Sequence, residues 1–245
     1  MTRRLIVNAD DFGQTAAINR GVVRAYDEGV VTSASLMVRW PAAREAAGAS
    51  LLRPRLSVGL HVDFGEWRYE HGAWREIYVV TPLRDARLLR DELGRQLERF
   101  RRLLGRDPTH LDSHQHVHRE EPAASVLAEA ADRLRVPLRH HGAAIGYCGS
   151  FYGQTEKGEP VPDALTVDAL TAILRTVPKG VTELACHPAA NGAVGGGYAE
   201  ERVRELETLC DPRVADVLAA ERIELCSFAD VANPRAASQS IIVAK

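Results

Sequence analysis

Four of the nine histidines lie within residues 110–118, a segment that also contains Asp112. If the segment is a strand, alternate side chains share one face, so His110, Asp112, His114, His116 and His118 would converge. If it is a helix, His114 and His118 would still share a face. Neutral imidazole is the commonest metal ligand in proteins. The pattern therefore favours a metal site over the alternatives, a polar surface strand or a mutually hydrogen-bonded group.

A second chemical signal is the pair of carboxylates Asp10 and Asp11, which follows the short apolar run 5–7. Adjacent side chains of a continuing strand face opposite sides, but where a strand ends the chain turns and both can reach one site. One carboxylate can then bind a cation while its neighbour accepts a proton. An Asx turn or helix cap at Asp11 is the structural alternative, and it accounts for only one of the two.

Further His and Asp residues follow other predicted strands. These residues are His61 and Asp63 after 57–62, Asp112 and His114 in the histidine segment, and His187 after 182–186. In parallel α/β folds, ligands bind at the carboxyl ends of the strands. The sequence therefore predicts that these side chains meet at one rim of the sheet. A predicted strand over 137–141 brings Arg139, His140 and His141 to the same region.

Short apolar runs alternate with helical patterns about seven times along the chain. Strands are predicted at 5–7, 35–38, 57–62, the start of the histidine segment, 137–141, 182–186 and 223–226. Helices are predicted between them, one capped by Thr15 and a long one from Asp85 that stops at Gly105. The alternation predicts an α/β fold with a parallel sheet wrapped by helices, and about seven units that close on themselves would make an incomplete (β/α) barrel. An open doubly wound sheet is the alternative.

Several segments lack a clear pattern. Residues 64–81 show no periodicity, 142–162 are predicted to form a loop, and 198–218 one helix. The glycine-rich stretch 191–197 is expected to be either a lid or a solvated connector. Neither an internal repeat nor a linker is visible, so we expect one domain over residues 1–245.

Composition excludes several classes of protein. Hydrophobic residues make up 45% of the chain, and the formal net charge of −2 gives no attraction for nucleic acid or anionic membranes. The four cysteines form no Cys-x-x-Cys pair, which argues against a structural zinc site or a disulfide framework. No signal peptide or membrane span is expected. These features indicate a cytoplasmic protein.

Four motifs, in order, carry a resemblance to a known family. They are Asn-Ala-Asp-Asp-Phe-Gly at 8–13, Gly-Leu-His at 59–61, His-Leu-Asp-Ser-His-Gln-His-Val-His at 110–118 and Cys-His-Pro at 186–188. From residue 5 to about 228, the chain resembles the YdjC-like (ChbG/HpnK) carbohydrate deacetylases. The first and third motifs are long and specific, whereas the other two count mainly by their order.

The resemblance implies a distorted seven-stranded barrel holding one divalent metal ion. It assigns Asp11, His61 and His114 as ligands, Asp10 as general base and His187 as the acid that protonates the leaving amine. Three protein ligands leave positions for water and substrate, as a catalytic metal site requires. By ligand type the set suits zinc, cobalt or nickel, while the family also allows magnesium. The implied substrate is a chito-oligosaccharide, another acetylated amino sugar or a glycolipid.

Other residues are assigned by reasoning from their types. We expect Arg139 to orient Asp10 through a bidentate contact, the alternative being an ordinary ion pair. His116, His118, Trp67 and Tyr152 are expected to contact substrate, with support of the metal ligands as the alternative for the two histidines. The aromatic residues of 64–81 could instead belong to the core or to a subunit contact in a homodimer.

Two other functions fit the same residues. A phosphoesterase with two or three metal ions would need more ligands, and His116, His118, Asp63 and Asp112 could supply them. A non-catalytic sugar-binding protein would not need both Asp10 and His187 beside a complete ligand set. Metal stoichiometry separates the first alternative from a deacetylase, and sugar binding without turnover would indicate the second.

Overall fold

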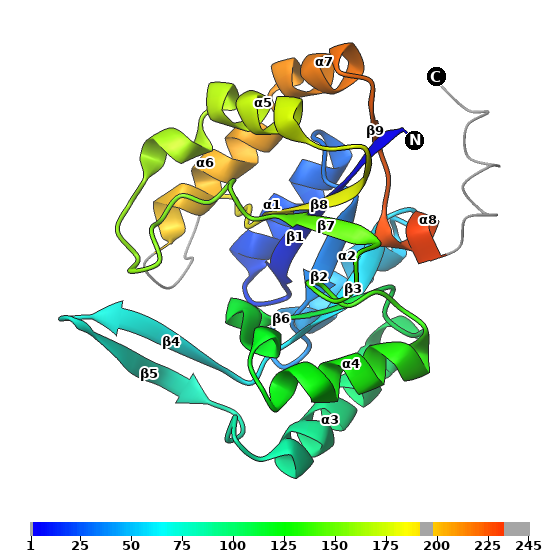
Figure 1. The fold of residues 1–245 in the computed structure, drawn as a ribbon, viewed down its shortest axis with the longest axis vertical. Coiled ribbons are helices and arrows are strands. Elements are labelled where there is room, and N and C mark those ends of the chain that lie inside the picture. The colour runs from blue at the N-terminus through cyan, green and yellow to red at the C-terminus, as the bar shows by residue number, and fades with distance from the viewer. Residues whose placement is uncertain (1, 192–197, 233–245) are drawn as a thin grey trace.

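The structure is a computed structural model that describes residues 2–191 and 198–232. Figure 1 shows the main sheet in the middle of the molecule, with α3 and α4 below it, α5 and α7 above it and α6 to its left. The elements are β1 (Arg3–Phe12), α1 (Ala16–Asp27), β2 (Ser33–Leu36), α2 (Ala43–Leu51), β3 (Ser57–Val62), β4 (Gly65–Glu70), β5 (Ala73–Val79), α3 (Ala86–Leu104), β6 (Leu111–Ser113), the 3-10 helix η1 (His114–Arg119), α4 (Ala123–Leu134), β7 (Ile145–Cys148), the 3-10 helix η2 (Pro162–Leu165), α5 (Val167–Thr176), β8 (Gly180–Cys186), α6 (Ala199–Leu209), α7 (Pro212–Ala220), β9 (Ile223–Leu225) and α8 (Phe228–Ala232).

The main sheet has seven strands, all paired in parallel. Six of them follow the order β6-β3-β2-β1-β8-β7, and the seventh, β9, pairs with β1 outside this order. The long central strand β1 pairs with β9 along Arg3–Leu5 and with β2 from Asn8 onward. The curled sheet does not close, although Leu111 beside one edge bridges to Leu138. The α/β class with about seven parallel strands is confirmed, and the barrel is incomplete.

The core lies between the sheet and the surrounding helices. Strands β1, β2 and β3 are buried over almost their whole length, as expected for a parallel sheet covered on both faces. Local signals set the helix ends where they were predicted. The Thr15 side chain accepts a hydrogen bond from Ile18 N at the start of α1, and α3 begins after the cap Asp85. Gly105 ends α3 with a left-handed φ of 68°.

Three predictions about the elements are wrong. Residues 137–141 form no strand, and the strand beside β8 is β7, inside the segment predicted as a loop. Residues 64–81, where no element was predicted, contain the antiparallel hairpin β4–β5, which projects from the body of the molecule (Figure 1). The helix predicted over 198–218 is two helices, because Asp211 caps a new helix with Pro212 in its first turn.

Two further expectations concern the chain outside these elements. In the part that the structure describes, no helix is both long and apolar enough to cross a membrane. The prediction of a lid or connector at 191–197 falls almost wholly outside the described residues, which resume at 198.

Candidate functional site

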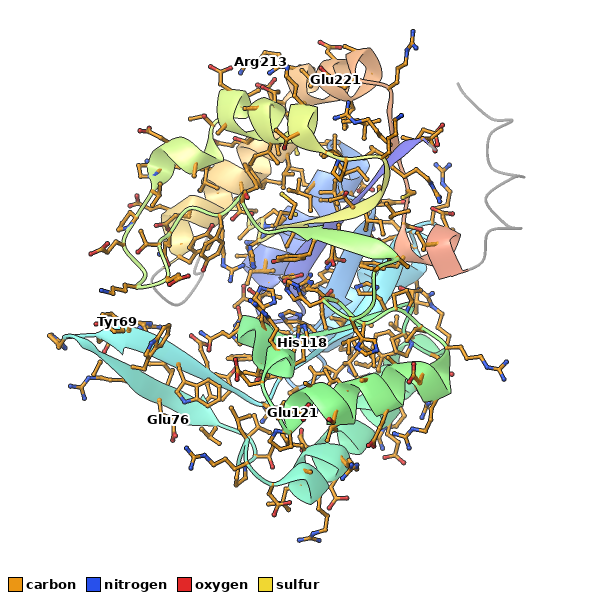
Figure 2. The ribbon with its side chains drawn as sticks, viewed as in Figure 1. Tyr69, Glu76, His118, Glu121, Arg213 and Glu221 are labelled. Atoms are coloured by element: carbon orange, nitrogen blue, oxygen red, sulfur yellow. The ribbon has the colours of Figure 1, made fainter. Side chains whose placement is uncertain are left out.

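A cavity of about 1440 Å³ opens at the carboxyl ends of the strands. It is bounded by the end of β1, the end of β3, the hairpin, η1, the segment after β7, the end of β8 and α6. Figure 2 shows the hairpin, with Tyr69 and Glu76, across from the central region that carries His118. The predicted residues that line the cavity are Asp10, Asp11, His61, His114, His116, His187, Trp67 and Tyr152. The other residues expected at this rim do not line the cavity: His118, Arg139, His140 and His141 line a smaller one, and Asp63 and Asp112 are buried.

The backbone at the end of β1 explains how two adjacent carboxylates reach this cavity. β1 continues through Phe12, but Asp11 has a φ of 63° and the register with β2 shifts between Ala9 and Phe12. This left-handed residue breaks the alternation of the strand. The Asp11 side chain accepts no helix-cap bond in the structure and instead faces histidines and an arginine.

Asp11, His61 and His114 form a compact group. The Asp11 Oδ1 atom lies 3.4 Å from His61 Nε2 and 3.1 Å from His114 Nδ1. The ligand atoms of all three lie within 4.8 Å of one another. The second oxygen, Oδ2, accepts a hydrogen bond of 2.5 Å from Arg202. Burial alone raises the pKa of Asp11, but Arg202 and His114 offset it and hold the pKa well below its usual value.

His61 is held by a carboxylate on the next strand. Its Nδ1 lies 2.8 Å from Asp112 Oδ1, and both side chains are almost completely buried. A histidine that donates one ring N–H to a carboxylate presents the other nitrogen in a fixed direction, as metal-ligating histidines do. Burial lowers the pKa of His61, but Asp112 and Asp10 more than offset it. Because Nδ1 contacts Asp112, the other ring nitrogen, Nε2, faces Asp11.

Asp10 lines the same cavity and is also part of a buried ionic network. Arg139 donates two hydrogen bonds of 2.7 Å to the two carboxylate oxygens of Asp10, which is the bidentate contact that the sequence predicted. Arg139 also contacts Glu183 at 2.6 Å and Asp112 at 3.0 Å. Burial raises the pKa of Asp10, but Arg139 outweighs it, so the pKa is lowered and the group is ionised.

His187 lies beside Asp10 at the end of β8. Its Nε2 is 3.8 Å from Asp10 Oδ2 and its Nδ1 is 3.8 Å from Glu205. Glu205 also accepts a hydrogen bond from the backbone N–H of His187 and one of 2.5 Å from the Tyr198 hydroxyl. The ring packs edge-on against Tyr152. The imidazole is thus positioned close to Asp10 by residues of the helical segment after 198.

The residues predicted to bind substrate take different places. The backbone of Trp67 exchanges two hydrogen bonds with the Gln115 side chain, 2.8 and 2.7 Å long, which ties the hairpin to η1. Tyr152 stacks on Tyr198 with ring centroids 4.7 Å apart and is 38% exposed. His116 lines the large cavity, whereas His118 is 4% exposed and lines a separate, smaller one.

The histidine segment does not converge on one face. β6 ends at Ser113, and Gln115 and His116 adopt left-handed φ values of 52° and 55°. His114 joins Asp11, while His116 and His118 turn toward His140. His110 is fully buried, stacks on Phe228 at 3.8 Å and hydrogen-bonds Ser35. The expectation of one converging strand face is therefore wrong, because the strand is too short.

The two carboxylates that could serve as extra ligands of a multinuclear centre, Asp63 and Asp112, have several polar partners. Asp63 accepts hydrogen bonds from Arg39, Trp40 and Tyr78. Asp112 contacts His61, Ser35 and Arg139. Asp63 is therefore engaged away from the Asp11 group, whereas Asp112 lies with Asp10 and His61 in a further group whose potential ligand atoms are within 4.8 Å of one another.

Sequence reasoning missed four residues that shape the site. Arg202 and Glu205 come from α6, Glu183 from β8 and Gln115 from η1. Arg202 and Glu205 stand three residues apart on a charged helix, a pattern that usually marks a solvated face. Only the tertiary packing of α6 against the end of β8 gives them a role.

Comparisons with known proteins agree with this architecture. The family model described as "YdjC-like protein" matches residues 4–220. A carbohydrate deacetylase of Geobacillus stearothermophilus is 35% identical, with 93% of this chain and 98% of that protein aligned. A chitooligosaccharide deacetylase of Serratia marcescens is 33% identical over 94% of this chain and all of that protein.

Among solved structures, a candidate cellobiose-phosphate cleavage protein of Enterococcus faecalis V583 has the same fold. Its TM-score is 0.78 at 24% identity, covering 94% of this chain and 99% of that one. With the family model matching most of the chain and two relatives above 30% identity along almost their full lengths, the chain belongs to the YdjC-like protein family.

Proposed function

We propose that this protein is a metal-dependent hydrolase that removes the acetyl group from an N-acetylated amino sugar. The observation that carries the proposal is the group Asp11, His61 and His114 on the same cavity as Asp10 and His187. The names of the relatives, carbohydrate and chitooligosaccharide deacetylases, support the reaction class.

The side chains fit a divalent ion. One carboxylate and two imidazoles are donors that zinc accepts, and they leave positions open to water and substrate. The contact between His61 and Asp112 is the second support, because it orients the ligand nitrogen before an ion arrives. When bound, such an ion polarises the acetyl carbonyl and lowers the pKa of water. We name magnesium or zinc as the resident ion.

Asp10 would act as the general base. Its carboxylate stays ionised because Arg139 lowers its pKa, so it accepts a proton from the attacking water without prior deprotonation. Arg139 fixes both oxygens, and Asn8 donates a further hydrogen bond of 3.0 Å to Oδ1. A carboxylate that is already held in its reactive orientation lowers the entropic part of the activation barrier.

His187 would act as the general acid. It stands 3.8 Å from Asp10 at its nearest approach, so both groups can serve one reaction centre from different sides. The amine that leaves an amide is a poor leaving group until it gains a proton. Glu205 accepts a hydrogen bond from the backbone N–H of His187 and Tyr152 packs against the ring, and these contacts would place the imidazole where that proton can be delivered.

The cavity supports an extended sugar substrate. Its volume of about 1440 Å³ exceeds that of most small-molecule pockets, which span roughly 300–1,000 Å³. Trp67 and Trp74 from the hairpin and Tyr152 from the opposite wall line it. Flat aromatic rings on two walls suit stacking on pyranose faces. We therefore propose a chito-oligosaccharide or a similar acetylated oligomer as substrate.

Acetate release from N-acetylglucosamine oligomers tests the proposal. The wild type should release acetate, chelation should stop it, and Asp10→Asn should lower kcat by about 10²–10⁴-fold, the usual contribution of a general base. Asp91→Asn, which changes an exposed carboxylate on α3, is the matched control and should keep full activity. Acetate release that survives Asp10→Asn would refute the assigned base, and release that survives chelation would refute metal dependence.

A further inference from the structure

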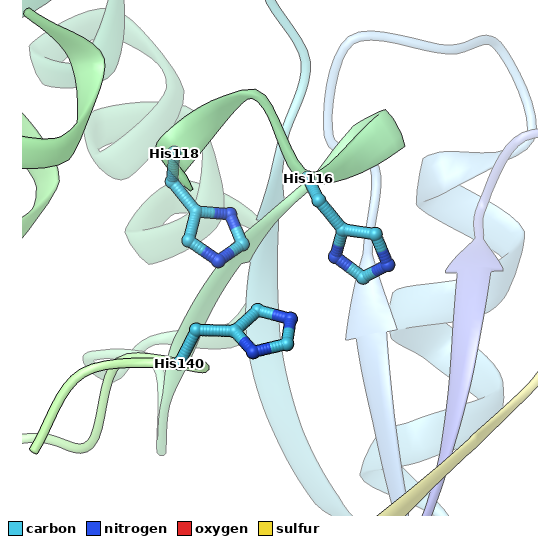
Figure 3. Close-up of side chains that lie close together, drawn as sticks. All are labelled: His116, His118 and His140. Atoms are coloured by element: carbon cyan, nitrogen blue, oxygen red, sulfur yellow. The ribbon is translucent and has the colours of Figure 1, made fainter. Parts of the chain in front are cut away.

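A second cluster of potential metal ligands lies apart from the Asp11 group. His116 and His118 from η1 and His140 from the turn after Leu138 bring one ring nitrogen each within 4.8 Å of the others. Figure 3 shows His116 and His118 approaching from one side and His140 from the other, around a common space. The cluster shares no residue with the Asp11 group.

In the rings of His116 and His118, a hydrogen bond occupies only one of the two nitrogens. His118 Nδ1 lies 2.6 Å from Ser113 Oγ, and His116 Nε2 lies 3.2 Å from the Tyr147 hydroxyl. The opposite nitrogens, His118 Nε2 and His116 Nδ1, are buried and have no hydrogen-bond partner in the described structure. His118 as a whole is only 4% exposed. A buried unpaired polar nitrogen is costly unless something binds it.

We propose that His116, His118 and His140 form a second metal site that takes a late first-row divalent ion, such as Zn²⁺, Ni²⁺ or Cu²⁺. Three imidazoles without a carboxylate suit these ions and do not suit Mg²⁺, which prefers oxygen ligands. Ring nitrogens that are anchored by hydroxyl groups on their far side match the usual support of metal-bound histidines.

The distances allow the ion to enter with small side-chain movements. Zn–N bonds of about 2.0–2.1 Å place tetrahedral ligand atoms about 3.3 Å apart, so the rings must close by at most about 1.5 Å. His140 is exposed, and His118 and His140 line a cavity of about 350 Å³, which gives the ion a path from solvent.

Neighbouring charge is compatible with a cation here. Arg139 is close to the cluster, but three carboxylates contact its guanidinium, those of Asp10, Asp112 and Glu183. Arg119 is the other nearby cation, and its side chain is exposed to water, which screens it. The ion would link η1, which carries the ligand His114, to the turn at 138–141 on the open side of the sheet.

Metal stoichiometry tests this site independently of activity. The protein is stripped with chelator, loaded with Zn²⁺, freed of excess ion and measured by mass spectrometry of its metal. We expect two ions per chain for the wild type, one for Asp11→Asn and one for His140→Asn. The neighbouring exposed His141, when changed in His141→Asn, is the matched control and should leave two ions. Circular dichroism checks that each variant is folded.

Cu²⁺ electron paramagnetic resonance identifies the ligands. In the Asp11→Asn background the spectrum should show nitrogen hyperfine splitting from imidazoles, and adding either His140→Asn or His116→Asn should remove it. Binding of a single ion by the wild type, lost in Asp11→Asn, would overturn the proposal. Two ions that persist in His140→Asn and His116→Asn would overturn it as well.

Discussion

At the scale of single residues, the site depends on one unusual backbone conformation. A regular strand would send Asp10 and Asp11 to opposite faces, yet both line one cavity because Asp11 has a φ of 63°. A non-glycine residue in the left-handed region costs about 1–3 kcal/mol and persists where the surroundings hold it in place. Here Arg202 and two histidines hold the Asp11 side chain. The left-handed conformation is the means by which adjacent carboxylates reach different partners, Arg202 and two histidines for Asp11 and Arg139 for Asp10.

The contact between Arg139 and Asp10 gives a prediction at this scale. Arg139→Lys keeps the positive charge but replaces a planar fork by a point charge, so Asp10 loses one of two hydrogen bonds. We expect kcat for deacetylation to fall about 10²-fold with little change in KM, since a misplaced base impairs the reaction more than binding. Steady-state kinetics checks the split. An unchanged kcat would show that Arg139 only balances charge.

At the scale of elements, the hairpin β4–β5 is the feature that builds one wall of the cavity. It is a two-stranded sheet outside the main sheet, and its Trp74 is 60% exposed. Isolated hairpins are marginally stable in water. The two hydrogen bonds between Trp67 and Gln115 therefore matter, because they attach the hairpin to η1 beside His114.

The hairpin gives a prediction about the binding of sugar oligomers. Trp67→Ala should raise KM for N-acetylglucosamine oligomers about 2- to 10-fold, the range that corresponds to a lost aromatic contact of about 0.5–1.5 kcal/mol, and leave kcat nearly unchanged. Trp67→Phe keeps a ring at this position and should retain most of the affinity. The measurement is KM for a series from monomer to tetramer. Equal KM values for wild type and Trp67→Ala on every oligomer would remove the hairpin from substrate binding.

At the scale of the whole molecule, the cavity brings together segments that are far apart in the chain. Its walls include Asp10, Trp67, His114, Tyr152 and Arg202, which come from five separate regions of the sequence. The cavity therefore exists only while the whole chain is folded. Buried titratable groups make the free energy of unfolding depend on pH. His110 is the clearest case, because burial lowers its pKa to about 4.

The sign of that dependence follows from proton binding. Below about pH 6.5 the unfolded chain protonates His110 while the folded chain resists until about pH 4, so the free energy of unfolding falls as pH falls between these values. One such group contributes a slope of about 1.4 kcal/mol per pH unit. Urea unfolding at pH 7, 6 and 5 should show a shallower decline for His110→Gln than for the wild type.

A histidine that is already exposed is the control for this prediction. His71 stands at the tip of the β4–β5 hairpin, so His71→Gln should keep the wild-type slope. Parallel curves for the wild type and His110→Gln would show that His110 titrates normally in the folded protein.

The sequence by itself determined the strands of high apolar content and the residues at their ends. Strands β1, β2, β3, β6 and β8 overlap their predicted positions, because runs that are buried on both faces are recognisable from composition alone. β9 also overlaps its predicted position, although two of its three residues are exposed. The convergence of Asp11, His61 and His114 follows from the rule that parallel strands end at one rim, together with the family motifs.

Only the tertiary structure decided the rest. β7 is a short strand with a glycine, and its pairing with β8, not its own composition, makes it a strand. The hairpin escaped prediction because β5 is exposed along almost its whole length and shows no alternation of apolar and polar residues, while β4 alternates over only a few half-buried residues. The division of the histidines into two groups depends on the turn after Ser113, where two left-handed residues redirect the chain. Long-range contacts set those conformations, and no local pattern encodes them.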